Sequence, residues 1–339
     1  MASTPPLESI LFRSADESVI LLDIPRSLEE SQVPIGEQPT RRLRSGPPPP
    51  KPLPTPEPKD AQEASSLAAA TQVAHLMTAE AARRALQLLA DYYTGPFCLE
   101  RLSSSSTPSA SSSSSASHTN PGIDILVPDG ARYICGSIEE TKQALLDEAP
   151  PSFDLIVLDP PWPNRSVRRH ADSYHTPRDL SETRRLLLQV PVSARLAPDG
   201  LVAVWITNKP AVYSLMTSPT TGVLAAWGLE LAAEWTWLKV AESGEPLYDL
   251  DSLWRKPWEK LLIATPRGGR APSALTAKVI VAVPDVHSRK PNLGMLFRDV
   301  LARDYVGLEV FARNLISGWW SWGDEVVKFQ QVDCWLQPC

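Results

Sequence analysis

The 339-residue sequence has little of what marks secreted, metal-stabilised or membrane-spanning proteins. Its four cysteines form no CxxC pair and have no histidine at zinc-ligand spacing, so we expect neither a disulfide framework nor a metal site. The sequence also lacks an apolar run of 18 residues, and its N-terminus has no basic stretch followed by an apolar core. These absences predict a soluble protein of a reducing compartment, without a membrane-spanning helix.

Glycine is scarce beside proline, with 16 glycines against 34 prolines. Many of the prolines precede Lys59, including Pro47 to Pro50, and such a segment can form neither a regular helix nor a central strand. The net charge of -6 excludes a surface coated with positive charge for nonspecific nucleic-acid binding. A local basic groove is compatible with that total, so nucleic-acid partners have to be judged from local charge.

The composition changes along the chain and predicts six segments. They are a small hairpin over 1–30, a proline-rich linker over 31–64, a helical cap over 65–102, a serine-rich disordered insertion over 103–122, a globular α/β domain over 123–333 and a tail over 334–339. The linker contains one basic cluster, Arg41-Arg42-Leu43-Arg44, for which a solvated charge run is favoured over a nuclear-import signal.

The globular domain alternates predicted strands with predicted helices. Strands are expected at 132–135, 153–158, 201–207, 229–239, 260–265, 278–283 and 308–313, and helices at 139–149, 179–196, 210–227 and 292–304. This alternation predicts a mostly parallel, doubly wound sheet. The closeness in sequence of 229–239 and 260–264 favours one antiparallel pair within it.

The sequence Asp159-Pro160-Pro161-Trp162 follows a short apolar run, and its two prolines prevent that strand from continuing. An acid and an aromatic are therefore expected at the carboxyl end of a strand, the edge at which open α/β sheets bind ligands. Asp159 can accept one hydrogen of an exocyclic amine, the Pro160 carbonyl can accept the other, and Trp162 can stack on a base. For these four residues taken alone, a plain strand-ending turn is the alternative.

Five ordered motifs extend this observation over most of the chain, from about 129 to 333. They are Asp159-Pro160-Pro161-Trp162 with Asn164-Arg165-Ser166-Val167, Glu234-Trp235-Thr236-Trp237-Leu238-Lys239, His287-Ser288-Arg289-Lys290-Pro291, Leu308-Glu309-Val310-Phe311-Ala312-Arg313-Asn314 and Gly318-Trp319-Trp320-Ser321-Trp322-Gly323. Together they resemble the eukaryotic N6-adenine methyltransferases, the family of the mRNA adenosine methylase, and within it the branch of methyltransferase-like protein 4. The resemblance implies an α/β fold, a Rossmann-like S-adenosylmethionine-dependent methyltransferase domain with a helical N-terminal extension and disordered segments.

The resemblance also implies roles for individual residues. The catalytic residues would be Asp159, Pro160, Pro161 and Trp162, and the cofactor-binding residues would be Ser137, Ile138, Asp159, Lys290, Arg313, Asn314, Asp324 and Glu325. Carboxylates near a strand end suit a ribose, because they can accept hydrogens from both of its hydroxyl groups. The sequence departs from the family at Asp324, where relatives usually carry asparagine, and the extra carboxylate is expected to weaken or retune cofactor binding.

A locally basic segment, residues 164–178, follows the Asp159 motif in an otherwise acidic protein. The residues expected to bind the nucleic-acid substrate there are Asn164, Arg165, Arg168, Arg169 and Tyr174, with a merely solvated loop as the alternative. Trp237 and Lys239 share one face of a predicted strand, and the resemblance places them in the wall of the substrate pocket. Trp235, on the same face, is expected in the core.

These observations predict an enzyme that transfers a methyl group from S-adenosylmethionine to the 6-amino group of adenine in nucleic acid, with small nuclear RNA and DNA both compatible. We expect a monomer in the nucleus, with the cytoplasm as a further location. A catalytically silent nucleic-acid-binding or scaffold subunit is the alternative, against which the intact Asp159 and Trp162 argue. Methylation of a cytosine amine is a second alternative, although related enzymes for that reaction more often have serine in place of the aspartate.

Overall fold

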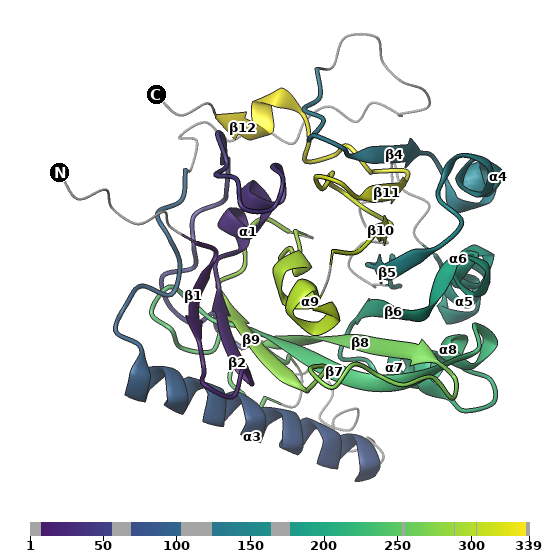
Figure 1. Cartoon of the computed structure of the whole chain (residues 1–339). Coiled ribbons are helices and arrows are strands. Elements are labelled where there is room, and N and C mark those ends of the chain that lie inside the picture. Colours follow the sequence, from purple (N-terminus) through teal and green to yellow (C-terminus); the bar gives the residue numbers. More distant parts are fainter. Residues whose placement is uncertain are drawn as a thin grey trace.

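A large curved sheet with helices on both of its sides organises the chain in the computed structural model, which describes residues 8–55, 69–102, 124–163, 177–252, 255–287, 289–302 and 304–336 (Figure 1). The sheet has ten strands in the order β1-β2-β9-β7-β8-β6-β5-β10-β11-β4. Their bounds are β1 Ile10–Arg13, β2 Val19–Leu22, β4 Arg132–Cys135, β5 Phe153–Leu158, β6 Leu196–Ile206, β7 Leu229–Lys239, β8 Trp258–Pro266, β9 Lys278–Ala282, β10 Gly307–Val310 and β11 Trp320–Gly323. Two further strands, β3 (Arg42–Leu43) and β12 (Trp335–Leu336), form a small second sheet.

Most neighbouring strands of the large sheet are parallel, as the alternation in the sequence predicts. Strands β4, β11, β10, β5 and β6 run in one direction, so their carboxyl ends share one edge. The antiparallel pair expected from 229–239 and 260–264 is confirmed as β7 and β8. Strand β8 is also antiparallel to β6 and therefore reverses the strand direction in the middle of the sheet.

The helices form two layers around the sheet. In chain order they are α1 Ile24–Glu30, α3 Ala69–Tyr92, α4 Ile138–Glu148, α5 Leu180–Gln189, α6 Val192–Arg195, α7 Pro210–Thr217, α8 Val223–Ala226 and α9 Gly294–Leu301, with a short 3-10 turn at Val332–Cys334. Figure 1 shows α1 and α9 on the concave side and α3 to α8 on the other. Among the described residues, no helix combines the length and apolar character needed to cross a membrane.

Three buried clusters fill these layers and follow the apolar residues of the strands. One lies between the sheet and α4, α5, α7 and α8, a second lies under α1 and α9, and a third lies under α3. The helical stretches predicted at 179–196 and 210–227 are each divided in two. Pro191 separates α5 from α6 because proline cannot donate a backbone hydrogen bond within a helix.

Two strand boundaries differ from the expectation where the site is built. The strand expected over 308–313 ends at Val310, because Phe311 adopts a left-handed backbone with a φ of 59° and turns the chain. Strand β11 was not among the strand predictions, because an alternation over only four residues that ends in a glycine is a weak strand signal. The early end of β10 places Phe311 and the residues that follow it in a loop at the carboxyl edge of the sheet.

The N-terminal segments belong to the domain rather than preceding it. The hairpin predicted within 1–30 exists as β1 and β2, but it extends the large sheet because β2 pairs in parallel with β9. Within the segments expected as a linker over 31–64 and a tail over 334–339, the described residues include β3 and β12, which pair with each other. The main-chain N–H of Glu242 and the carbonyl of Pro49 are hydrogen-bonded at 2.8 Å, so the proline-rich stretch lies against the sheet domain.

The other predictions for the N-terminal third of the chain differ in their outcome. The helical cap expected over 65–102 is represented by the single helix α3, whose inner face packs on the sheet through Ala82, Ala85 and Leu89. The serine-rich insertion expected over 103–122 lies outside the described residues. The basic cluster near residue 42 is not a solvated charge run, because Leu43 is buried and Arg42 pairs with the buried carboxylate of Glu29 at 2.9 Å.

Candidate active site

The carboxyl ends of β5 and β10 bring the two main motifs together. Asp159 directly follows β5, while Arg313 and Asn314 lie in the turn after β10. All three residues line one pocket with Lys290, which lies in the loop between β9 and α9. Four of the residues predicted for catalysis or cofactor binding are therefore neighbours in space although they span 155 positions of the chain, from 159 to 314.

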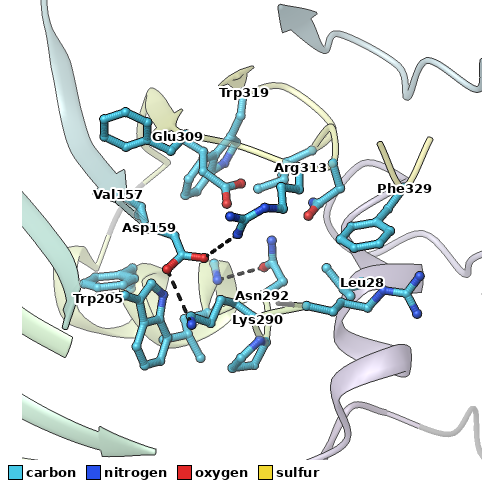
Figure 2. Close-up of a pocket in the computed structure, with 18 residues that line it drawn as sticks. Leu28, Val157, Asp159, Trp205, Lys290, Asn292, Glu309, Arg313, Trp319 and Phe329 are labelled. Atoms are coloured by element: carbon cyan, nitrogen blue, oxygen red, sulfur yellow. Dashed lines mark hydrogen bonds and ion pairs between the residues drawn. The ribbon is translucent and has the colours of Figure 1, made fainter. Parts of the chain in front are cut away.

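Asp159 is the centre of this pocket, and both of its carboxylate oxygens are paired. Arg313 donates from Nη1 to Oδ2 at 2.8 Å, and Lys290 Nζ lies 3.4 Å from Oδ1 (Figure 2). Only 9% of the Asp159 surface is exposed. Since a carboxylate offers about four lone pairs, two cations fix its position and leave acceptor sites toward the pocket.

The two cations extend the pairing on either side. Lys290 also binds Glu259 at 2.8 Å, Glu259 accepts a hydrogen bond from Lys239, and Arg313 donates from Nε to Glu325 at 3.0 Å. Burial raises the pKa of Glu259, but the charges of Lys290 and Lys239 outweigh it and lower that pKa to about 2. Burial opposes the charge of Lys290, and the Asp159 and Glu259 carboxylates nevertheless raise its pKa above the ordinary value.

Glu309 on β10 adds a carboxyl group of a different kind. Its side chain lines the pocket and has no hydrogen bond or ion pair with any residue in the described part of the chain. Burial, and then the nearby charge of Asp159, raise its pKa to about 8. Figure 2 shows Glu309, Asp159 and Arg313 converging on one space. A half-buried carboxyl group that lines a pocket and has no partner among the described residues indicates a ligand site.

The rest of the pocket wall is largely apolar. Leu28, Val157, Phe297, Ile316, Trp319 and Phe329 line it, together with Trp205 and Asn292. Gly307 at the start of β10 allows the Trp319 ring to lie against the strand, because a Cβ at this position would lie 2.3 Å from Cδ2 of that ring. The combination of an apolar wall with a few convergent charged groups is typical of small-molecule sites.

The other residues of the Asp159 motif are placed beside the pocket. Pro160 is buried, Pro161 is half-buried, and the indole N–H of Trp162 donates to the Trp205 carbonyl at 2.9 Å. This bond fixes the edge of the Trp162 ring, which remains half-buried at the carboxyl edge of the sheet. Trp162 is thus oriented by the protein and is not part of the deep core.

Ser137, Ile138 and Asp324 lie further along the same edge and do not line the Asp159 pocket. Ser137 caps α4 by accepting from the N–H of Glu140, and Ile138 is buried beneath it. Asp324 follows β11 and is exposed, and its carbonyl contacts the Cys135 thiol. Glu325, in contrast, reaches the pocket residues through its ion pair with Arg313.

The residues predicted for substrate binding divide into two groups. Asn164, Arg165, Arg168, Arg169 and Tyr174 lie outside the described residues. Trp237 and Lys239 are described: Trp237 is buried and meets Trp205 edge to face at 6.0 Å, and the Lys239 ammonium lies 4.5 Å from the Trp237 ring centre. Trp235 stacks on Phe297 in the core, as its pattern predicts.

Sequence reasoning missed Glu259, Glu309 and Asn292 as site residues. Glu259 was within reach, because the antiparallel pair of β7 and β8 places it opposite Trp237 and diagonal to Lys239. Glu309 gave a weaker signal, a single acid inside an apolar strand, which the burial cost of a carboxyl group makes unusual. The described residues contain no group of three or more His, Cys, Asp or Glu side chains placed to hold a metal ion.

Comparison of the sequence with known proteins shows similarity to nucleic-acid methyltransferases. The MT-A70 family model matches residues 153–325, which include β5, the Asp159 motif, Glu259, Lys290 and the turn after β10. A protein of Cryphonectria parasitica named N6-methyladenosine RNA methyltransferase MTA1 is 48% identical over 337 residues, covering 97% of this chain and 94% of that protein.

Two further relatives show how far the similarity extends. A protein of the same name from Pyricularia oryzae is 44% identical over 364 residues, covering 96% of each chain. The Homo sapiens protein named N(6)-adenine-specific methyltransferase METTL4 is 35% identical over 227 residues, covering 63% of this chain and 46% of that protein. The similarity to the fungal proteins therefore includes the N-terminal segments that precede the matched family domain.

Proposed function

Because this chain belongs to the MT-A70 family, we propose that it is a methyltransferase that uses S-adenosylmethionine to methylate the 6-amino group of adenine in nucleic acid, with RNA as its substrate. The geometry of Asp159 is the observation that carries this proposal. Its carboxylate is fixed between Arg313 and Lys290 in a pocket at the carboxyl ends of the strands, next to the carbonyl of Pro160. RNA is favoured over DNA because the two fungal relatives, which match nearly the whole chain, are named as RNA methyltransferases.

The pocket residues fit the methyl donor on chemical grounds. Lys290 and Arg313 are cations that would hold its carboxylate, and Glu309 would accept hydrogens from its ammonium or hydroxyl groups. Leu28 and Phe329 supply apolar surface. The carboxyl of Glu309 is the strongest sign of fit, because this half-buried group has no partner among the described residues and a ligand in the pocket could supply its hydrogen bond.

The donor, when bound, supplies a methyl group already activated by a positively charged sulfur. The protein then has to position the amine and increase the electron density on its nitrogen. Asp159 accepts one amine hydrogen and the Pro160 carbonyl accepts the other, which favours a tetrahedral nitrogen. Trp162, fixed by its bond to Trp205, offers its ring to the base, and such stacking contributes about 1 to 3 kcal/mol per base at other sites.

Transfer of labelled methyl from S-adenosylmethionine to matched RNA and DNA oligonucleotides tests the proposal. We expect N6-methyladenine in the RNA and a loss of at least about a hundredfold in Asp159→Ala, as when one preorganised group at a reacting centre is removed. Equal, nonzero transfer by the wild type and Asp159→Ala would contradict the role of Asp159. Donor binding without transfer to any adenine substrate would instead identify a catalytically silent subunit. Label in DNA alone would overturn the choice of RNA.

A monomeric, nuclear protein is the simplest state that accords with this function. The pocket is built from residues of one chain, so no second copy is needed to complete it. Sedimentation of the purified chain tests whether it is a monomer, and microscopy of a fluorescently tagged chain tests whether it is nuclear.

A further inference from the structure

Helix α1 lies far from the family domain in sequence but reaches the pocket in space. The domain match begins at residue 153, whereas α1 spans Ile24–Glu30. Leu28 of α1 is 4% exposed and lines the pocket with Ile316 and Phe329. Figure 2 shows α1 beside the pocket, with Leu28 next to Phe329 and across from Asp159.

Hydrogen bonds join α1 to both loops that carry the charged residues of the pocket. The main-chain N–H of Asn292 donates to Ser27 Oγ at 3.1 Å, two residues after Lys290. On the other side, Ser317, four residues after Arg313, donates from its N–H at 2.8 Å to the carbonyl of Ser31, the residue that caps the C-terminal end of α1. The Lys290 loop and the Arg313 turn are therefore held against one helix.

The helix is itself firmly anchored. Asp23 caps it by accepting from the N–H of Arg26 at 2.9 Å, and the second Asp23 oxygen accepts from the N–H of Leu99. At its other end, the buried Glu29 carboxylate accepts from Arg42 and from the N–H of Leu43, both at 2.9 Å. Helix α1 can consequently act as a fixed wall rather than as a loose appendage.

We propose that α1 is a binding element for the methyl donor, with Leu28 as a contact residue and Ser27 as a positioning residue for the loop of Lys290 and Asn292. This inference rests on the proposed function and adds to it a segment that the family domain does not include. Helix α1, in the N-terminal part of the chain, then contributes to the affinity for the methyl donor.

A matched pair of leucines tests the contact. Leu28→Ala and Leu43→Ala remove the same atoms from residues that are 4% and 2% exposed in the same buried cluster, and only Leu28 lines the pocket. Calorimetric titration of the full chain with S-adenosylmethionine should give a dissociation constant about tenfold higher for Leu28→Ala, the effect of a lost apolar contact. Leu43→Ala should stay within about twofold of the wild type while losing a similar amount of thermal stability. Equal affinities for the two variants would overturn the proposal.

A matched pair of serines covers the case in which a leucine variant fails to fold. Ser27→Ala removes the acceptor of the Asn292 N–H, whereas Ser31→Ala removes a hydroxyl that donates to the Leu28 carbonyl at the C-terminal end of α1. We expect weaker donor binding for Ser27→Ala alone, and equal affinities would again overturn the inference. If the wild type binds no donor, the proposed function fails with it. If the wild type binds donor and the variants match their controls, only the inference about α1 fails.

Discussion

Replacing Glu259 by glutamine removes the anion that lies between Lys239 and Lys290. Both lysines bind its carboxylate, and the Glu259 side chain is 21% exposed, so water screens these pairs only in part. The substitution conserves shape and leaves two ammonium groups without their shared partner. Glu259→Gln should therefore lower the stability of the protein and weaken the hold of Lys290 on Asp159.

The size of the effect follows from the lowered pKa. A fall from the ordinary 4.5 to about 2 corresponds to about 3 kcal/mol of stability at neutral pH, because each pKa unit is worth about 1.4 kcal/mol. For a carboxylate whose pKa is lower in the folded state, this contribution is complete above the unfolded pKa and is lost as the pH falls through the folded one. At pH 3 about half of it should remain.

Urea unfolding of the wild type and Glu259→Gln at pH 7 and pH 3 measures this contribution. The difference in unfolding free energy should be about 3 kcal/mol at pH 7 and about half of that at pH 3. Glu37→Gln, at an exposed glutamate, is the control and should change stability by less than about 0.5 kcal/mol at either pH. A difference that is the same at both pH values would refute the reasoning, because the cost would then come from packing and not from charge.

Three further predictions concern the residues around Asp159. Arg313→Lys should lower the rate of methyl transfer about tenfold or more, since a lysine cannot bridge Asp159 and Glu325 as the guanidinium does, whereas Arg298→Lys at a surface pair should leave the rate within about twofold. In the wild type, the affinity for the donor should rise as the pH rises through about 8, and Glu309→Gln should make this affinity less dependent on pH. Identical pH profiles of the two proteins in calorimetric titration would rule out a role for this carboxyl. Gly307→Ala should cost about 1 to 3 kcal/mol in urea unfolding, because its Cβ would collide with the Trp319 ring, and an unchanged midpoint would show that the ring moves freely.

The sequence predicts the parts of the fold in which local pattern and tertiary environment agree. Strand β5 is apolar because helices cover both faces of the sheet, and the two prolines after Asp159 mark its end. The antiparallel pair of β7 and β8 was predicted because the two segments are neighbours in sequence. The pairing of β3 with β12 had no such signal, because two-residue strands 292 positions apart, from 43 to 335, are defined by contacts and not by composition.

The residues of the candidate site also divide into those that the sequence predicts and those that it does not. Asp159, Lys290 and Arg313 stand in recognisable motifs near strand ends, and parallel strands bring such ends to one edge of the sheet. Leu28 could not be predicted as a site residue, since nothing in an apolar residue of a short helix distinguishes a pocket wall from a core position. The separation of Ser137 from the Asp159 pocket also depends on strand order, which places β10 and β11 between β5 and β4.

The charges around Asp159 explain why Glu309 has to be considered together with its neighbours. Asp159, Glu259 and Glu325 alternate with Lys239, Lys290 and Arg313, and all six side chains are less than a quarter exposed. The charges of these six groups cancel, and Lys328, which pairs with Glu325 at 2.8 Å, adds one positive charge at the more exposed end of the network. S-adenosylmethionine carries a net positive charge at neutral pH, because its sulfonium is added to a balanced amino acid group. Glu309, which is largely protonated at neutral pH, can supply the matching negative charge by releasing its proton when the donor binds. The demethylated product has lost the sulfonium charge, so its affinity should depend less on pH than that of the donor.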